Sequence, residues 1–179
     1  MSERIEIPAD KLNMNVCGIW SRDWLLLSAG DFASKRYNMM TVGWGAFGVM
    51  WGKPFAMAVV RPQRFTRRFI EESGCFTLCA FPESCRDALR FCGAKSGRDL
   101  PDKAAAAGLS ACAAQCVSAP AYDEAELVVE CAVNYRSGFD GAKMTDSGIL
   151  EQWYPGGDLH EVYFGEILHI SGTEKYLAR

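Results

Sequence analysis

Hydrophobic and polar positions alternate with a period of two along much of the chain, which is the pattern of half-buried β-strands. The clearest run is 125–136. One face of that run holds Leu127, Val129, Cys131, Val133 and Tyr135. Further strand-like runs lie at 15–20, 24–30, 38–44, 55–60, 75–81 and 161–170. This series of strands predicts an antiparallel sheet closed into a barrel.

Three short helices are predicted between the strands, at 67–73, 82–92 and 101–107. Thr66 can cap the first of them, and Gly74 can end it in a left-handed turn. The other two each open on proline and stop before glycine, which is the usual asymmetry of helix ends. The glycine-rich segment 136–161 is predicted to be a long excursion of the kind that often serves function or an interface.

The chain has 179 residues, of which 49% are hydrophobic and 23% are charged, and this composition is ordinary for a globular protein. This length suits one good-sized core, so residues 1–179 are expected to form a single domain. The formal charge of −3 argues against a dedicated nucleic-acid binder. With no secretion-signal pattern and no membrane-length apolar run, we expect a cytoplasmic protein without a membrane partner.

Eight cysteines are spread along the chain without a Cys-x-x-Cys pair. In a chain with no secretion signal, reduced thiols are the expected state. Cys112 and Cys116 have the i, i+4 spacing of a helix, but His160 and His169 are the two histidines that could complete a zinc site. Because the usual ligand spacing is missing, no metal site is predicted.

The stretch 43–48, Gly-Trp-Gly-Ala-Phe-Gly, fits the G-x-G-x-x-G fingerprint of a dinucleotide-binding turn. A Rossmann turn needs a helix that opens at the second glycine and an acidic residue about twenty positions on. Here Pro54 follows closely, and positions 67–68 are both arginine. The glycines instead indicate either close approach of a ligand or partner chain, or a glycine-rich hairpin with no ligand.

Arginines are concentrated in the segment 61–68, at Arg61, Arg64, Arg67 and Arg68. The segment runs from an apolar strand into a predicted helix, whose first N–H groups attract anions. One interpretation is a phosphate site, and the other is a solvated basic face paired with glutamates one turn on. We favour phosphate, because Arg61 and Arg64 precede the helix and are outside that pairing.

Four blocks, in this order, resemble the flavin reductase-like, FMN-binding split-barrel family, and in particular its flavoredoxin-type members. The blocks are YNMMTVGW, KPFAMAVVRPQRFTRRFIEESGCFTLCAFP, CGAKSGRDLPDK and HEVYFGEILHI, and the resemblance spans about residues 16–170. It implies a mainly β fold, a six-stranded antiparallel split barrel with short flanking helices. It also implies a homodimer that binds FMN near the dimer interface.

The resemblance assigns roles to individual residues. The residues expected to line the flavin ring and ribityl chain are Asn38, Met39, Met40 and Thr41. The residues expected to hold the phosphate are Arg61, Arg64, Phe65 and Thr66. Ser96 and Lys103 are expected near the rim of the cofactor. His160 stands where the family often has a histidine before the last strand, near the face that a nicotinamide would approach. The family commonly reads Asp-His there, whereas Leu159 separates Asp158 from His160 in this chain.

The activity that follows from the resemblance is hydride transfer from NAD(P)H to flavin, because the cofactor carries the redox chemistry and the protein orients it. The alternatives are an electron-transfer flavoprotein that takes electrons from a redox protein partner, and a non-catalytic FMN-binding module. His169, on a predicted strand, is interpreted as a packed histidine. Trp153 and Tyr154 would either cap the flavin from a partner subunit or pack in an interface.

Overall fold

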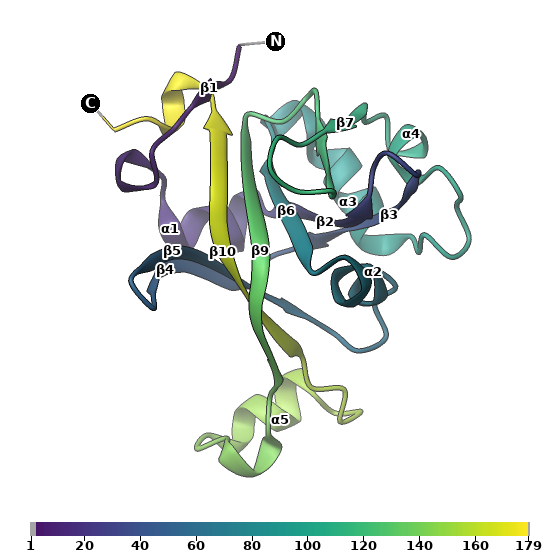
Figure 1. The fold of residues 1–179 in the computed structure, drawn as a ribbon. Helices are drawn as coiled ribbons and strands as arrows, with labels where there is room; N and C mark the ends of the chain where they lie inside the picture. Colours follow the sequence, from purple (N-terminus) through teal and green to yellow (C-terminus); the bar gives the residue numbers. More distant parts are fainter. Residues whose placement is uncertain (1–2, 179) are drawn as a thin grey trace.

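A computed structural model describes residues 3–178 of the chain. Its main element is an antiparallel sheet in the order β3-β2-β6-β9-β10-β5-β4, with β1 added on β10 (Figure 1). The strands of this sheet are β1 Ile5–Glu6, β2 Leu25–Asp31, β3 Arg36–Val42, β4 Gly45–Met50, β5 Lys53–Val60, β6 Cys75–Ala80, β9 Leu127–Gly138 and β10 Glu161–Gly172. A separate hairpin joins β7 Ala111–Ala113 to β8 Pro120–Tyr122.

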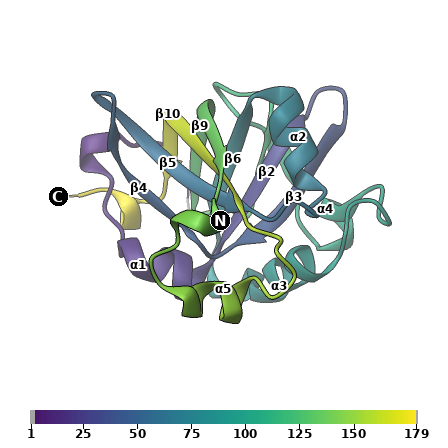
Figure 2. The ribbon, with the colours of Figure 1, turned by 90° about the horizontal axis from the view of Figure 1, so that it is seen from below.

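The sheet curves into an open barrel (Figure 2). Within residues 3–178, no ladder of hydrogen bonds joins the end strands β3 and β4. The predicted split-barrel class is therefore confirmed, although the sheet has more strands than the six expected. The additional strands are β1 and β4, which lie outside the predicted strand-like runs.

Five short helices flank the sheet: α1 Val16–Gly18, α2 Thr66–Ser73, α3 Arg86–Ala94, α4 Lys103–Ala106 and α5 Ser147–Trp153. The helix predicted at 67–73 is confirmed, and it ends at Gly74 with φ 65°. Thr66 does not cap it, because the Thr66 side chain is buried inside the first turn and accepts a hydrogen bond from Asn38. Gly93 does not stop α3, which continues one residue further.

The strand predicted at 15–20 is wrong. Asn15 accepts a hydrogen bond from the Gly18 amide and caps α1, and a π-helical turn follows at Ile19–Asp23. The pattern misled because a buried helical turn is apolar in the same way as a short buried strand. Cys112 and Cys116 are also not on a helix, since Cys112 lies in β7.

Two apolar cores lie on opposite faces of the sheet. The barrel interior holds Leu25, Leu27, Val60, Phe76, Leu78, Val129 and Tyr163, all fully buried. The outer face of β2, β3 and β6 packs against α3, α4 and β8 through a second cluster that includes Met39, Cys79, Leu89 and Tyr122. Because these two cores cover both faces of β2 and β6, almost all residues of these strands are buried. Their sequences therefore do not alternate between apolar and polar residues.

Two glycines of the 43–48 stretch, Gly43 and Gly45, make room for tryptophans of the same chain. A Cβ on Gly45 would collide with the Trp20 ring, and one on Gly43 would come within 3.3 Å of Trp24. Trp20 also packs against Phe47, with ring centroids 5.3 Å apart. The stretch forms β4 and its approach, and β4 pairs with β5, so no helix follows the glycines and the dinucleotide fingerprint is coincidental.

The excursion between β9 and β10 carries α5 and projects beyond the ends of these two long strands (Figure 1). It turns back so that Tyr154, directly after α5, is buried against the barrel mouth. No helix among the described residues is long and apolar enough to cross a membrane.

Candidate functional site

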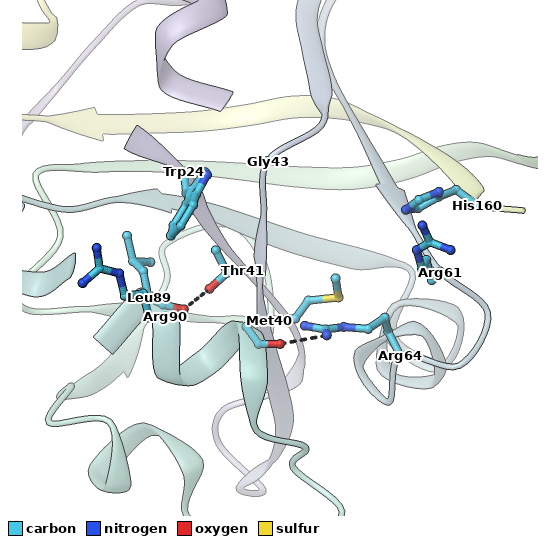
Figure 3. A pocket seen from close by; sticks show the side chains of 10 residues that line it. Trp24, Met40, Thr41, Gly43, Arg61, Arg64, Leu89, Arg90 and His160 are labelled. Carbon is cyan, nitrogen blue, oxygen red and sulfur yellow. Dashed lines mark hydrogen bonds between the residues drawn. The ribbon is translucent and has the colours of Figure 1, made fainter. Parts of the chain in front are cut away.

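Two cavities meet at β3, which is an end strand of the sheet. The first, of about 440 Å³, is lined by Trp24, Met40, Thr41, Gly43, Arg61, Arg64, Leu89, Arg90, Gly93 and His160 (Figure 3). The second, of about 190 Å³, is lined mainly by β3, the start of α2 and the loop 94–98, with Lys103 at its base. Met40 and Arg64 belong to both walls, so the two cavities form one elongated site.

Strand β3 divides the predicted block 38–41 between its two faces. Asn38 is buried and donates through Nδ2 to Thr66 Oγ1 at 2.9 Å. Met40 lines both cavities. Met39 packs in the outer core, so it reaches the site by its carbonyl oxygen and not by its side chain. Thr41 donates through Oγ1 to the Leu89 carbonyl, which ties β3 to α3 (Figure 3).

Lys103 and Arg64 are cations without a carboxylate partner in the described chain. Lys103 is 4% exposed and donates from Nζ to the carbonyls of Met39 at 2.7 Å and Cys92 at 2.8 Å. Burial lowers its pKa to about 8. Arg64 donates to the Gly93 carbonyl at 2.9 Å, and burial lowers its pKa too. Two such charges beside one cavity favour an anionic ligand, because a buried charge is costly until it is paired.

Arg61 lies at the other end of the site and is already paired. It forms an ion pair with Asp158 and donates to the Trp153 carbonyl at 2.8 Å. Gln63 also donates to Asp158, so this carboxylate holds the excursion against the loop before α2. Arg61 and Arg64, which were both predicted to hold the phosphate, line the larger cavity together, but only Arg64 also lines the smaller cavity beside Lys103.

His160 is buried beside Arg61 in the wall of the larger cavity (Figure 3). Its Nδ1 is 2.8 Å from the hydroxyl of Tyr154, and the Trp44 ring lies 5.0 Å from the imidazole. Burial, helped by the positive charge of Arg61, lowers the pKa of His160 to about 4. The imidazole is consequently neutral near pH 7, and Nε2 is the nitrogen left for a ligand.

The loop after α3 closes the smaller cavity. Ser96 accepts a hydrogen bond from the Arg98 amide, and Arg98 lies over the Phe65 ring at 5.1 Å. Gly97 sits so close to the Asn38 side chain that a Cβ there would collide with it. Thus the predicted residues Asn38, Met40, Arg64, Phe65, Thr66, Ser96 and Lys103 are brought together, while Arg61, Thr41 and His160 line the larger cavity.

Sequence reasoning missed the wall that faces His160. Trp24 has φ 63° and ψ 157°, a backbone region that residues other than glycine rarely adopt. The Arg86 guanidinium stacks on its ring at 3.7 Å and donates to the carbonyl of Asp23 at 2.8 Å. Leu89 and Gly93 complete this wall from α3. No local pattern marks these residues, because their approach to β3 is a tertiary contact.

The structure also shows the surroundings of His169, Tyr154 and Trp153. His169 is a packed histidine, as predicted, with Nδ1 3.1 Å from the buried carboxylate of Glu130. Tyr154 is tied to His160 of its own chain, and Trp153 makes an edge contact with Trp44 at 5.0 Å. No group of three or more His, Cys, Asp or Glu side chains placed to hold a metal ion occurs among the described residues.

Comparison with known proteins gives a consistent result. A family model described as "Flavin reductase like domain" matches residues 23–178. A flavoredoxin from Methanosarcina acetivorans superposes with a TM-score of 0.67 at 23% identity, covering 93% of this chain and 76% of that one. The flavoredoxin of Desulfovibrio vulgaris (Miyazaki F) has the same TM-score at 20% identity, with coverages of 93% and 80%.

A more distant structural relative is nitrilotriacetate monooxygenase component B from Bacillus cereus. Its TM-score is 0.63 at 17% identity, and the match covers 88% of this chain and 75% of that one. A search of curated protein sequences finds no match. At these identities, the likeness to the solved structures establishes the fold.

Proposed function

Because the chain belongs to the flavin reductase-like domain family, we propose that it is an FMN-binding oxidoreductase that transfers hydride from NAD(P)H to flavin. The observation that carries the proposal is a pair of cations, Lys103 and Arg64, at one end of an elongated cavity. Neither cation pairs with a carboxylate among the described residues. FMN has a phosphate at one end and a flat ring at the other. Structural relatives described as FMN-binding proteins support the same cofactor.

The residues of the smaller cavity fit a phosphate in both charge and donors. Lys103 and Arg64 supply positive charge, while the hydroxyls of Thr66 and Ser96 supply short polar groups. The close seat of Gly97 on Asn38 shows that the loop forms a cradle with no space for a side chain. We therefore assign the phosphate to this cavity, because charge-assisted hydrogen bonds are strongest where water is excluded.

The larger cavity suits the ring. Its walls are apolar at Trp24, Met40 and Leu89 and carry a neutral imidazole on the opposite side. Bound FMN would supply hydride acceptance and one- or two-electron chemistry, which no side chain here provides. His160 would offer Nε2 as a hydrogen-bonding group of fixed orientation, since Tyr154 holds Nδ1.

A homodimer is part of the proposal. Trp44, Trp153 and Ile149 are between 38% and 43% exposed, and all three line an apolar hollow of about 670 Å³ beside the wall of the larger cavity. Apolar surface of this kind is typical of subunit contacts. Sedimentation velocity at micromolar protein concentration measures the oligomeric state. A monomer that still binds FMN would remove the dimer from the proposal.

The decisive experiment for the activity is a visible spectrum of the purified chain under anaerobic conditions. With FMN added, we expect a protein-bound flavin spectrum that NADH or NADPH bleaches. A chain that gains no bound flavin would refute the cofactor. Bound flavin that neither nicotinamide bleaches would refute NAD(P)H use and favour an electron carrier with a redox protein partner, as the likeness to flavoredoxins suggests. Inertness toward such partners as well would leave a non-catalytic FMN-binding module.

A further inference from the structure

Trp24 joins the π-helical turn Ile19–Asp23 to β2 in a backbone conformation that suits glycine. Its φ of 63° and ψ of 157° lie in a region that is strained for any residue with a side chain. Among the described residues, Lys35 and Trp51 are the other non-glycine residues with positive φ, and both lie in the turns of β-hairpins. Such turns commonly use the left-handed conformation. The strain at Trp24 therefore needs a separate explanation.

Packing alone does not explain a tryptophan at this position. The Trp24 side chain is only partly buried, and it lies at the edge of the outer core. Glycine would relax the backbone here, and a smaller apolar residue would still cover the core edge. Strained backbone of this kind is concentrated at ligand and active sites, where the surrounding structure enforces it. Trp24 lines the larger cavity, so a role toward its ligand is the explanation that fits.

Arg86 holds the indole in place. Its guanidinium lies 3.7 Å from the centroid of the Trp24 ring and donates to the Asp23 carbonyl at 2.8 Å. One side chain thus fixes both the ring and the peptide group that precedes it. Within residues 3–178, the lining of the larger cavity includes Trp24 but not Arg86. The ring therefore stands between the cation and the cavity.

Gly43 limits the ring on a second side. A Cβ on Gly43 would come within 3.3 Å of the indole and 3.2 Å of the Trp20 carbonyl. Figure 3 shows the Trp24 ring close to Gly43 and across the cavity from His160. The indole is thus held by neighbours on two sides before any ligand arrives, and it presents a flat aromatic surface to the cavity.

We propose that the Trp24 indole stacks on the flavin ring and that Arg86 is a positioning residue acting through the indole. The inference rests on the proposed function, which assigns the flavin ring to the larger cavity. An electron-rich indole suits the electron-poor oxidised flavin. The cation on the ring holds it by a cation–π contact, and a ring fixed in advance loses little freedom when the ligand binds.

The test uses riboflavin beside FMN, because riboflavin has the flavin ring without the phosphate. Calorimetry gives both dissociation constants, and fluorescence of the bound flavin is recorded in the same titrations. Trp24→Leu keeps an apolar side chain but has no aromatic face. It should weaken both ligands by the same factor, about tenfold. It should also restore fluorescence, since an indole stacked on a flavin quenches it.

Trp51→Ala is the matched control. Trp51 is a tryptophan with positive φ that is 64% exposed in the β4–β5 turn, outside the cavity, so its loss should change neither affinity nor fluorescence. Trp24→Gly relieves the backbone strain and serves as the second variant if Trp24→Leu does not fold. Wild-type riboflavin affinity and quenching in a folded Trp24 variant would overturn the stack.

Arg86 is tested by a double-variant comparison. Arg86→Ala should weaken riboflavin by about threefold and restore part of the fluorescence. In Trp24→Leu the same change should have no further effect on riboflavin, because a residue that acts through the ring has nothing left to position. Additive losses would overturn the positioning role. If the wild type binds neither flavin, the proposed function fails and the inference with it, whereas unchanged Trp24 variants of a flavin-binding wild type defeat the inference alone.

Discussion

Two buried charges in this molecule differ in how completely they are satisfied. Glu130 is 1% exposed, and its carboxylate accepts hydrogen bonds from the amides of Gln115, Cys116 and Val117 and contacts His169. Lys103 is about as buried, but its ammonium donates to two carbonyl oxygens and, within residues 3–178, contacts no carboxylate. The hydrogen bonds to the first charge hold a loop, whereas we propose that a ligand phosphate completes the second.

The number and kind of its partners distinguish a buried charge that serves the fold from one that serves a ligand. A buried ion with a full set of partners stabilises the fold, and its neighbours have nothing further to offer a ligand. A buried ion with partial satisfaction lowers stability and raises affinity for a counter-ion. The lowered pKa of Lys103, about 8, is the electrostatic sign of that second condition.

The largest effect is expected at the complete site. Glu130→Leu removes the acceptor of three backbone amides, so the free energy of unfolding should fall by about 3–5 kcal/mol. Urea denaturation of the variant and of wild type measures this loss in the free energy of unfolding. The control is Glu126→Leu, which breaks a surface pair with Lys175 and should cost under about 1 kcal/mol. Equal losses in the two variants would show that burial of Glu130 confers no special role.

The next effect is a pH dependence at Lys103. Its pKa is lower in the folded chain than in the unfolded chain, so between pH 8 and 10.5 the unfolded state binds more protons and this residue's contribution to stability rises with pH. The contribution is at most about 3 kcal/mol across that window. FMN affinity should fall over the same window, since Lys103 loses the charge that attracts the phosphate.

Other groups titrate in this range, so the prediction concerns a difference. Burial raises the pKa of Tyr163 to about 12, which makes stability fall with pH for that group. Wild type minus Lys103→Met should isolate the lysine, in stability from urea titrations and in affinity from FMN titrations. Parallel pH profiles for the two proteins would contradict a functional charge at Lys103.

A third comparison sets Arg64 against Arg61. Arg64→Ala should weaken FMN binding by about 1.5–3 kcal/mol, because the guanidinium lines the cavity proposed for the phosphate and has no carboxylate partner among the described residues. Arg61 is already paired with Asp158, so Arg61→Ala should change FMN affinity by less than about 1 kcal/mol and loosen the excursion instead. The reverse ranking would move the phosphate to the His160 end of the site.

The sequence predicted much of this fold because the apolar residues of β9 that face the barrel interior recur at every second position. The alternation in β9 and the glycine after α2 are local signals, and they were read correctly. The strand expected at 15–20 failed because Asn15 caps a helical turn whose apolar residues resemble a strand. β4 was missed because its two glycines, Gly45 against the Trp20 ring and Gly48 against the Phe55 ring, weaken the strand pattern.

The site was predictable only in part, for a related reason. The block at 38–41 and the start of α2 carry local patterns, and the structure brings Asn38 onto Thr66. The contact of Lys103 with the Met39 carbonyl joins residues 64 positions apart. The wall made by Trp24 and α3 also depends on tertiary contacts. So does the difference between Arg61, which pairs with Asp158, and Arg64, which donates to the Gly93 carbonyl. Those features depend on how the elements pack, which spacing along a chain does not encode.

The smallest effect tests whether the Glu130 site is complete without its histidine. His169→Phe removes one partner of Glu130 and leaves the three amide donors of residues 115–117 in place. It also removes the Nε2 atom, which is buried without a hydrogen-bond partner in the described structure, so the two changes offset each other. The free energy of unfolding should change by less than about 1 kcal/mol, measured in urea beside Glu130→Leu. A loss as large as that of Glu130→Leu would show that the histidine contact, and not the ring of amides, satisfies the carboxylate.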